Sequence, residues 1–353
     1  MIPPEIEARI PELEARYRNR GKSGSKASLR EFLTTLYENE GSAYRTAKVL
    51  GMSHQMAADR RNRFETDTGI TMPRGRPETW KPAAHNQTTH IKIENGSMLL
   101  ISDTHFWPGV YSTAWAAFVG LAESLKPTFI CIDGDGIDGC KTSRHPPNGW
   151  EDAPELKDEI REFQDRLQSI QAASPGSRFI YAPGNHDVGR LDRYVAMNAP
   201  ELKGLPGLSF KELVPAWDFS GRFVINDYRK HKAIPYRIPT IIKHAFKRSG
   251  IHATRNAVQD EGCHIIHGHL HKQLVSPVSN FNGDMYGVDL GVGAAVDGPQ
   301  FHYMQANTTG WRSGGALLTW ENYEMQPPEL FTVTNEDEGK FRFRGVTYTV
   351  EWR

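Results

Sequence analysis

Four short runs of β-type residues in this sequence are each followed by side chains that can bind a metal ion. The runs are residues 98–101, 128–132, 178–181 and 265–266. The residues that follow them are, in order, Asp103 and His105, then Asp135, then Asn185 and His186, then His269 and His271. Short runs of β-type residues that end in turn residues predict strands. Ligands at strand ends share one edge of a sheet, so the sequence predicts a metal site there.

The spacing within two of these groups adds to this prediction. Asp103 and His105 are separated by one residue, and so are His269 and His271. In an extended segment, residues i and i+2 point to the same side. Each pair is therefore expected to bind a single centre.

The ligand types indicate which metal such a site would hold. Carboxylate and amide oxygens favour hard cations, imidazoles favour borderline ones, and no thiolate is present in the set. We therefore expect two divalent ions, Mn²⁺ by preference, with Fe or Zn²⁺ as alternatives to it. A carboxylate such as Asp135 can bridge two cations about 3.5–4 Å apart, an arrangement suited to phosphoryl chemistry.

In this order the motifs resemble those of the calcineurin-like metallophosphoesterase family, and the sequence is most similar to the phage and prophage branch of that family. The matching stretches are residues 103–105, 134–138, 184–187 and 268–271. The resemblance implies an α/β domain over residues 96–353, with two mixed β-sheets packed as a sandwich and flanked by helices. The ligands that it implies are Asp103, His105 and His271 for one ion, Asn185 and His269 for the other, and Asp135 between them.

The same resemblance implies roles for residues near the ligands. His186 would not bind metal, but would stabilise the transition state or protonate the leaving oxygen, with Asp187 orienting its ring. Asp138 is expected to support a ligand or loop instead of binding metal directly. Arg190 and Arg193, in the variable stretch that follows, are candidates to bind a substrate phosphate.

One further histidine is expected in the family before the last motif. The sequence offers His231, His244 and His252 at about the expected place. We choose His244 because it follows the apolar run of residues 238–242 and precedes a helical stretch at about 251–262. His244 is therefore predicted to be the seventh metal ligand.

The first 66 residues predict a separate helical domain. Apolar residues at helical spacing over 29–37 indicate one helix, Ser42 can begin a second, and Ser53 can begin a third that runs to about Phe64. Gly51 permits the sharp turn between the last two. Two short helices joined in this way are typical of a DNA-binding helix-turn-helix, although an αα-hairpin used for oligomerisation has the same pattern.

Several residues of the third helix are candidates for DNA contact, because the second helix of such a motif lies in the major groove. They are His54, Gln55, Arg60, Arg61, Asn62 and Arg63. Arg60 occupies a position at which many such motifs have an apolar packing residue. Through residue 90 the sequence has 15 Lys and Arg against 11 Asp and Glu, so this region carries 15 − 11 = +4 and favours binding to nucleic acid.

Residues 67–95 are predicted to be a linker, since they are rich in Pro, Thr and His and have no period. Within it, residues 73–77 have the sequence Pro-Arg-Gly-Arg-Pro, which resembles the core of an AT-hook. In that motif the two arginines, here Arg74 and Arg76, insert into a narrow A·T-rich minor groove. A charged linker without DNA contact has the same composition.

Composition limits the remaining possibilities. The formal net charge is zero, and no apolar run approaches the length of a membrane span. Three cysteines without ligand spacing fit a reducing compartment, so we expect a cytoplasmic protein, bacterial or phage-encoded. The sequence favours a DNA-directed nuclease or end-processing phosphodiesterase. A phosphatase for phosphoproteins or small nucleotides, and a DNA-binding regulator or packaging factor with an inactive metal domain, are the alternatives.

Overall fold

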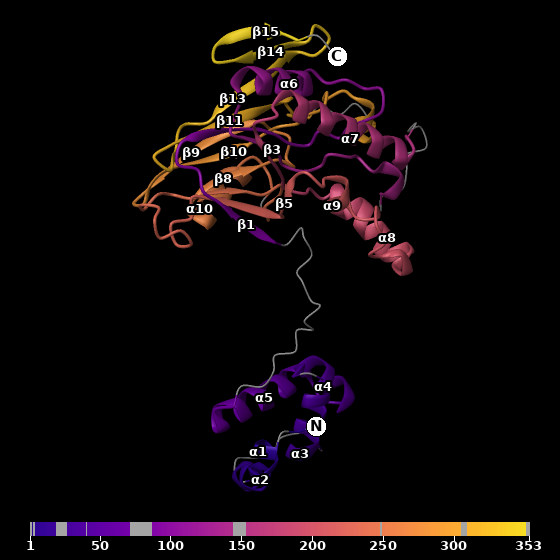
Figure 1. Cartoon of the computed structure of the whole chain (residues 1–353), viewed down its shortest axis with the longest axis vertical. Coiled ribbons are helices and arrows are strands. Elements are labelled where there is room, and N and C mark those ends of the chain that lie inside the picture. The colour runs from indigo at the N-terminus through magenta and orange to yellow at the C-terminus, as the bar shows by residue number, and fades with distance from the viewer. Residues whose placement is uncertain are drawn as a thin grey trace. The chain divides into compact units, whose positions relative to one another are not determined.

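The computed structural model describes residues 2, 4–18, 27–39, 41–70, 87–143, 153–247, 249–304 and 309–350. These residues belong to two compact units, residues 1–81 and 82–353 (Figure 1). Each unit has its own hydrophobic core. None of the helices in the described part of the chain is long and apolar enough to cross a membrane.

The first unit is all-α. Its helices are α1 (Pro4–Glu7), α2 (Ile10–Arg18), α3 (Leu29–Glu38), α4 (Ala43–Val49) and α5 (His54–Thr68). The hydroxyls of Ser28, Ser42 and Ser53 accept hydrogen bonds from the backbone in the first turns of α3, α4 and α5, as helix-capping serines do. Gly51 lies between α4 and α5 with a φ of 62°, a conformation that glycine adopts at little cost.

The three helices predicted for this unit are present, and α5 continues beyond its expected end. Helices α1 and α2 have no counterpart in the sequence prediction. They contribute Ile6, Ile10 and Leu13 to the core of the unit, beside Phe32 and Leu36 of α3. The apolar positions in α1 and α2 are too few for a helical period to stand out.

Arg60 packs within the first unit. Its guanidinium lies 4.7 Å from the centre of the Phe32 ring and donates hydrogen bonds to the backbone oxygen of Ala27, at 3.2 Å. Arg61 also makes a contact within the unit, because it donates a hydrogen bond to the backbone oxygen of Gly41 at 3.2 Å. Arg60 therefore occupies the packing position of the helix with its own side chain, and DNA contact by these two arginines stays a prediction.

We expect Arg60→Ala to loosen the packing of α5 on α3. Loss of the cation–π contact and of the hydrogen bonds to Ala27 should cost about 1–2 kcal/mol of local stability. Hydrogen–deuterium exchange of the full chain would show this as faster exchange in residues 29–38 and 54–68. Arg63→Ala, at an exposed position of the same helix, is the matched control and should leave the exchange rates unchanged. Equal rates in both variants would contradict the packing role.

The second unit contains two mixed β-sheets. One has 6 strands in the order β1-β6-β7-β8-β10-β9, and the other has 9 strands in the order β15-β14-β13-β11-β2-β3-β4-β5 with β12 paired to β11. The strands are β1 (Thr88–Ile91), β2 (Gly96–Ile101), β3 (Phe129–Ile132), β4 (Arg178–Tyr181), β5 (Asp218–Phe219), β6 (Arg222–Ile225), β7 (Thr240–Ile242), β8 (His264–His267), β9 (Leu274–Asn280), β10 (Gly283–Asp289), β11 (Gly314–Glu321), β12 (Glu324–Met325), β13 (Glu329–Asn335), β14 (Lys340–Phe343) and β15 (Val346–Thr349).

The two sheets pack face to face and are covered by helices on their outer sides. The helices are α6 (Thr113–Leu125), α7 (Leu156–Ala173), α8 (Arg193–Asn198), α9 (Phe210–Leu213) and α10 (Ala253–Glu261), with short turns η2 (Cys140–Thr142), η3 (Asp187–Asp192), η4 (Pro200–Leu202) and η5 (Pro299–Met304). Met98 and Leu100 of β2 lie in the core between the sheets, whereas Leu99 and Ile101 face α6 and α7. This alternation confirms the predicted α/β sandwich.

Strand β1 corrects the predicted linker. Residues Thr88 to Ile91 pair in parallel with β6, from Arg222 to Ile225. The linker prediction is therefore wrong for this part of residues 67–95, which belongs to the sheet of the second unit. A run of four residues next to a Pro-rich stretch is too short to show a period. Arg74 and Arg76 of the AT-hook-like segment lie outside the described residues.

Candidate metal centre

The predicted ligands follow the carboxyl ends of neighbouring strands. Strands β2, β3 and β4 are parallel neighbours in one sheet, and β7 and β8 are parallel neighbours in the other. The loops after β2 and β3 are joined by backbone hydrogen bonds, from Asp103 to Gly134 and from His105 to Asp135, each of 2.9 Å. The strand pairing and these bonds hold Asp103, His105 and Asp135 next to one another.

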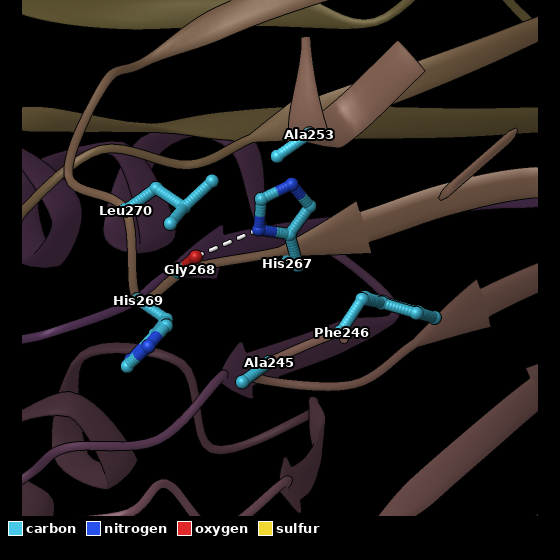
Figure 2. A pocket seen from close by; sticks show the side chains of 7 residues that line it. All are labelled: Ala245, Phe246, Ala253, His267, Gly268, His269 and Leu270. Atoms are coloured by element: carbon cyan, nitrogen blue, oxygen red, sulfur yellow. Dashed lines mark hydrogen bonds between the residues drawn. The ribbon is translucent and has the colours of Figure 1, made fainter. Parts of the chain in front are cut away.

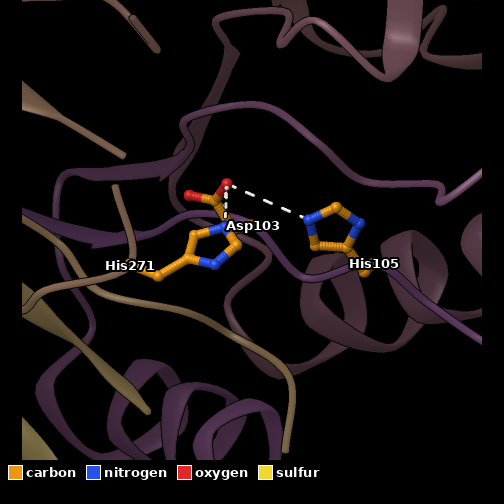
Figure 3. Close-up of side chains that lie close together, drawn as sticks. All are labelled: Asp103, His105 and His271. Carbon is orange, nitrogen blue, oxygen red and sulfur yellow. Dashed lines mark hydrogen bonds and ion pairs between the residues drawn. The ribbon is translucent and has the colours of Figure 1, made fainter. Parts of the chain in front are cut away.

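One group of ligands consists of Asp103, His105 and His271 (Figure 3). The distance from Asp103 Oδ1 to His271 Nε2 is 2.9 Å, and that to His105 Nε2 is 4.0 Å. All three side chains are buried, Asp103 completely. Burial opposes ionisation of Asp103, but the rings of His271 and His244 lower its pKa below the usual value. The carboxylate is therefore held in its charged form.

A second group consists of Asp135, His244 and His269. His244 Nε2 lies 3.1 Å from Asp135 Oδ2 and 3.8 Å from Asp103 Oδ1, so the two groups adjoin each other. Burial opposes protonation of His244, yet the carboxylates of Asp135 and Asp103 raise its pKa well above the usual value. Of the three candidates for the lone histidine, the structure brings His244 to the carboxylates.

The backbone at these positions is left-handed. Asp103, Asp135, His269 and His271 have φ values of 52°, 52°, 69° and 60°, and His105 has 37°. Non-glycine residues rarely adopt this conformation, and it tends to occur at functional sites. The assumption of an extended segment is therefore wrong for both pairs. Asp103 and His105 still meet in one group, whereas His269 and His271 turn to different groups.

The chemistry of the ring nitrogens fits bound cations. His105 Nε2, His244 Nε2 and His271 Nδ1 are buried and have no hydrogen-bond partner among the described residues. Unpaired buried polar atoms are costly, and a deprotonated imidazole nitrogen can bind a metal ion. Two of the three also face carboxylates: His105 Nε2 lies 4.0 Å from Asp103, and His244 Nε2 lies 3.1 Å from Asp135. The residues of both groups therefore fit two divalent ions.

His267 provides a contrast within the same segment. Its Nδ1 lies 2.7 Å from the backbone oxygen of Gly268 and its Nε2 lies 2.8 Å from Thr254 Oγ1. Figure 2 shows His267 and His269 pointing away from each other. Both line a cavity of about 10 Å³, which has room for about one water molecule. Burial lowers the pKa of His267 to about 4. His267 is a neutral structural residue with both nitrogens satisfied.

Two glycines allow the loops to approach the ligands closely. A Cβ on Gly184 would lie 2.0 Å from Asp135 Oδ1, and a Cβ on Gly268 would lie 2.3 Å from Asp103 Oδ2. Both distances are shorter than any real contact between these atoms. The glycines in the third and fourth motifs are therefore required by space at the metal centre.

Comparison with known proteins identifies the family. Residues 97–273, half of the chain, match the calcineurin-like phosphoesterase family. The chain belongs to this family. It is 28% identical over 265 residues to the gene 54 protein of Mycobacterium phage D29, a match that covers 72% of this chain and 98% of the phage protein. This relative agrees with the resemblance to the phage branch.

Two solved structures are similar to the calcineurin-like phosphoesterase described here. One is Vps29 of Entamoeba histolytica in complex with zinc, with 14% identity, coverage of 71% of this chain and 98% of Vps29, and a TM-score of 0.37. The other is the phosphoesterase YfcE of E. coli, with 12% identity, coverage of 72% of this chain and 100% of YfcE, and a TM-score of 0.35.

The family assignment indicates what the two ligand groups bind. A calcineurin-like phosphoesterase is a metal-dependent hydrolase that uses a dinuclear metal site. The chain supplies candidate ligands for both ions from four strand ends, those of β2, β3, β7 and β8. Asn185, the predicted amide ligand, is exposed, and its neighbour His186 donates its backbone N–H to Asp135 Oδ1 at 2.7 Å.

His186 lies beside the metal-ligand groups of the phosphoesterase. Its ring is 4.6 Å from that of His105, and its Nδ1 is 2.8 Å from the backbone oxygen of Asp138. Asp138 Oδ1 lies 3.2 Å from His105 Nδ1 and 3.3 Å from His186 Nδ1, so it holds both rings. Burial opposes the charged form of His186, but Asp135 and Asp138 raise its pKa to about 9.

Asp187 does not orient the His186 ring, and that prediction is wrong. Its carboxylate accepts hydrogen bonds from the backbone of Asp135, Gly136 and Gly184, at 3.0, 2.8 and 2.8 Å, and from the Tyr181 hydroxyl at 3.0 Å. These bonds join the loops after β3 and β4. Asp187 therefore fixes the backbone at Asp135 and Gly136. The residue that orients the His186 ring is Asp138.

The two arginines predicted to bind substrate differ in position. Arg190 lies next to His186, with a guanidinium nitrogen 3.2 Å from His186 Nε2 and another 3.2 Å from the backbone oxygen of Gly139. Arg193 is exposed on α8, where it donates to Met197 Sδ at 3.3 Å, one turn further along the helix. Only Arg190 is brought to the catalytic groups.

Several residues at the site were missed by sequence reasoning. The aromatic rings of Phe301 and Trp311 lie 5.8 and 4.5 Å from the ring of His271. Glu159 of α7 is buried and accepts a hydrogen bond from the backbone of Gly139 at 2.6 Å. Isolated aromatic residues far from any motif carry no sequence signal, but the apolar helical face around Glu159 could have marked it as a buried acid.

Glu159 should make stability depend on pH. Burial raises its pKa to about 7, from the usual 4.5, so the folded state retains a proton that the unfolded state has lost. Its contribution is complete below pH 4.5 and is lost as pH rises towards 7. We expect the melting temperature of Glu159→Gln, relative to wild type, to rise between pH 5 and 8. The exposed Glu123→Gln is the control, and a parallel pH profile of Glu159→Gln and wild type would contradict this prediction.

Proposed function

We propose that this phosphoesterase is a phosphodiesterase directed to DNA, acting as a nuclease or on DNA ends. The observation that supports it is the position of His186 and Arg190 beside two adjoining ligand groups. Asp103 is 3.8 Å from His244, so both groups can act on one phosphate. Cations bound there, Mn²⁺ by preference, would activate the nucleophile and neutralise charge on the phosphate oxygens.

In this proposal the side chains around the ions have separate tasks. His186 Nδ1 donates to the Asp138 carbonyl, and its Nε2 lies 3.2 Å from the Arg190 guanidinium, where the phosphate is proposed to bind. From there Nε2 gives its proton to the leaving oxygen. Arg190, beside it, binds the phosphate through its planar guanidinium, a geometry suited to two phosphate oxygens.

The helical unit is proposed to bring the enzyme to DNA. His54, Gln55, Asn62 and Arg63 are exposed on α5, as a recognition helix requires. Arg74 and Arg76 are proposed to add minor-groove contacts in the following segment. Arg60 and Arg61 make packing contacts within the unit, so the proposed surface rests mainly on the four exposed residues.

A comparison of substrates tests the proposal. We expect the Mn²⁺-loaded enzyme to cleave plasmid DNA and end-labelled duplex as well as p-nitrophenyl phosphate, and EDTA to abolish all three activities. Cleavage of p-nitrophenyl phosphate alone would support the phosphatase alternative. The Arg74→Ala/Arg76→Ala variant should bind DNA less tightly, with a smaller salt dependence, while retaining its activity on p-nitrophenyl phosphate.

A further inference from the structure

A set of aromatic side chains forms one side of the metal centre. Phe301 of η5 is buried, and its ring lies 5.2 Å from that of His105 and 5.8 Å from that of His271. Trp311 packs against both Phe301, at 5.1 Å, and His271. These contacts anchor η5 directly beside the first ligand group.

Tyr303 follows on the same short turn but is not buried. Its ring lies 6.5 Å from that of Phe301 in an edge-on arrangement, and the residue is 47% exposed. Burial of its hydroxyl and the negative charge of Asp138 raise the pKa of Tyr303 to about 12, which agrees with a position near the centre. About half of Tyr303 is thus accessible to solvent, next to Phe301 at the edge of the site.

Arg190 adds a positive charge to this edge. Its guanidinium lies beside His186 and acts electrostatically on Tyr303 as well. A phosphate with a planar aromatic group attached matches this pair, because the guanidinium binds the phosphate and the ring offers a stacking surface. Bases stack on exposed aromatic side chains regardless of their sequence, since every base has a π-face.

We infer that Tyr303 stacks on the base next to the scissile phosphate while Arg190 binds that phosphate, which makes the substrate a nucleotidyl phosphodiester. This inference rests on the proposed phosphodiesterase activity and adds the residue that recognises the nucleoside. Stacking is independent of base identity, so the site would accept DNA of any sequence. Sequence preference, where it exists, would then belong to the helical unit.

Two chromogenic esters with the same leaving group test it: thymidine 5′-(p-nitrophenyl phosphate) and methyl p-nitrophenyl phosphate. The measured quantity is the ratio of kcat/KM for the first to that for the second. Tyr303→Ala should lower this ratio about 10-fold, the size expected for loss of one stacked base. Tyr303→Phe retains the ring and should keep the ratio of the wild type. Tyr348→Ala, at a position of β15 that is 43% exposed, is the control for removal of a surface tyrosine.

Arg190→Gln tests the other half of the inference. Both esters contain the phosphate, so kcat/KM should fall at least 10-fold for both and their ratio should stay constant. An unchanged ratio in Tyr303→Ala would overturn the stacking role, and an equal drop in Tyr303→Phe would assign the effect to the hydroxyl instead. A wild-type enzyme that cleaves neither ester would overturn the proposed phosphodiesterase activity and this inference together.

Discussion

Asp135→Asn is expected to bind one divalent ion where the wild type binds two, and to lose about 1,000-fold in kcat/KM. The amide keeps the oxygen that accepts the backbone N–H of His186, so the loop geometry should survive. It removes the negative charge 3.1 Å from His244, which a cation in the second group requires. Loss of a catalytic ion costs several kcal/mol of transition-state stabilisation, of which about 4 kcal/mol corresponds to 1,000-fold.

Metal content and activity have to be measured on the same samples. Elemental analysis after gel filtration gives the number of ions per chain, and turnover of p-nitrophenyl phosphate gives the activity. Asp297→Asn, an exposed position outside the ligand groups, is the matched control and should retain two ions. Two ions in Asp135→Asn would contradict the assignment of this ligand. A metal-free wild type that still binds DNA would support the regulator alternative.

The layers of the catalytic unit could be predicted because local pattern and long-range packing agree in them. Residues 98–101 are apolar without interruption, and β2 is buried on both faces, between the second sheet and α6. Helix α7 has the apolar spacing of a helix with one buried face. Where an element is short, as β1 is, only its pairing with β6 identifies it.

The identity of the ligands could be read from the sequence, but their grouping could not. Motif order predicted that Asp103, His105, Asp135, His269 and His271 lie at one sheet edge. The structure does bring them together, but from strand ends of two different sheets. Their distribution depends on left-handed backbone at each ligand, which no residue type in the motifs demands. The alternation of side-chain direction along a strand ends at the last residue of the strand. For β8 that residue is His267, so the rule does not predict the direction of His269.

The roles of charged side chains were the least predictable feature. Asp187 and Asp138 are both acids near His186, and only the course of the backbone decides that Asp138 meets the ring while Asp187 faces inward. Arg60 looks like a DNA-contacting residue in the sequence, yet Phe32 lies against it. Partners of this kind are separated by tens of residues and are created by the fold.

His186→Asn separates proton donation from metal binding. Asparagine can still donate to the Asp138 carbonyl, but it has no counterpart of Nε2. The loop should therefore keep its conformation while the proposed proton donor is removed. We expect kcat to fall about 100- to 10,000-fold, with two ions retained and KM nearly unchanged. His252→Ala, an exposed histidine before α10, is the control.

The leaving group decides what His186 does. A deoxyribose oxygen needs a proton to depart, whereas p-nitrophenolate departs readily without one. If His186 Nε2 protonates the leaving oxygen, its removal should slow DNA cleavage much more than cleavage of a p-nitrophenyl ester. Equal losses on both substrates would instead mean that the ring stabilises charge on the phosphate oxygens, as Arg190 is proposed to do from the adjacent position. His186 Nε2 lies 3.2 Å from Arg190, and His186 Nδ1 is hydrogen-bonded to the Asp138 carbonyl. The ring is therefore placed for either action, and this comparison tests the proposed proton transfer directly.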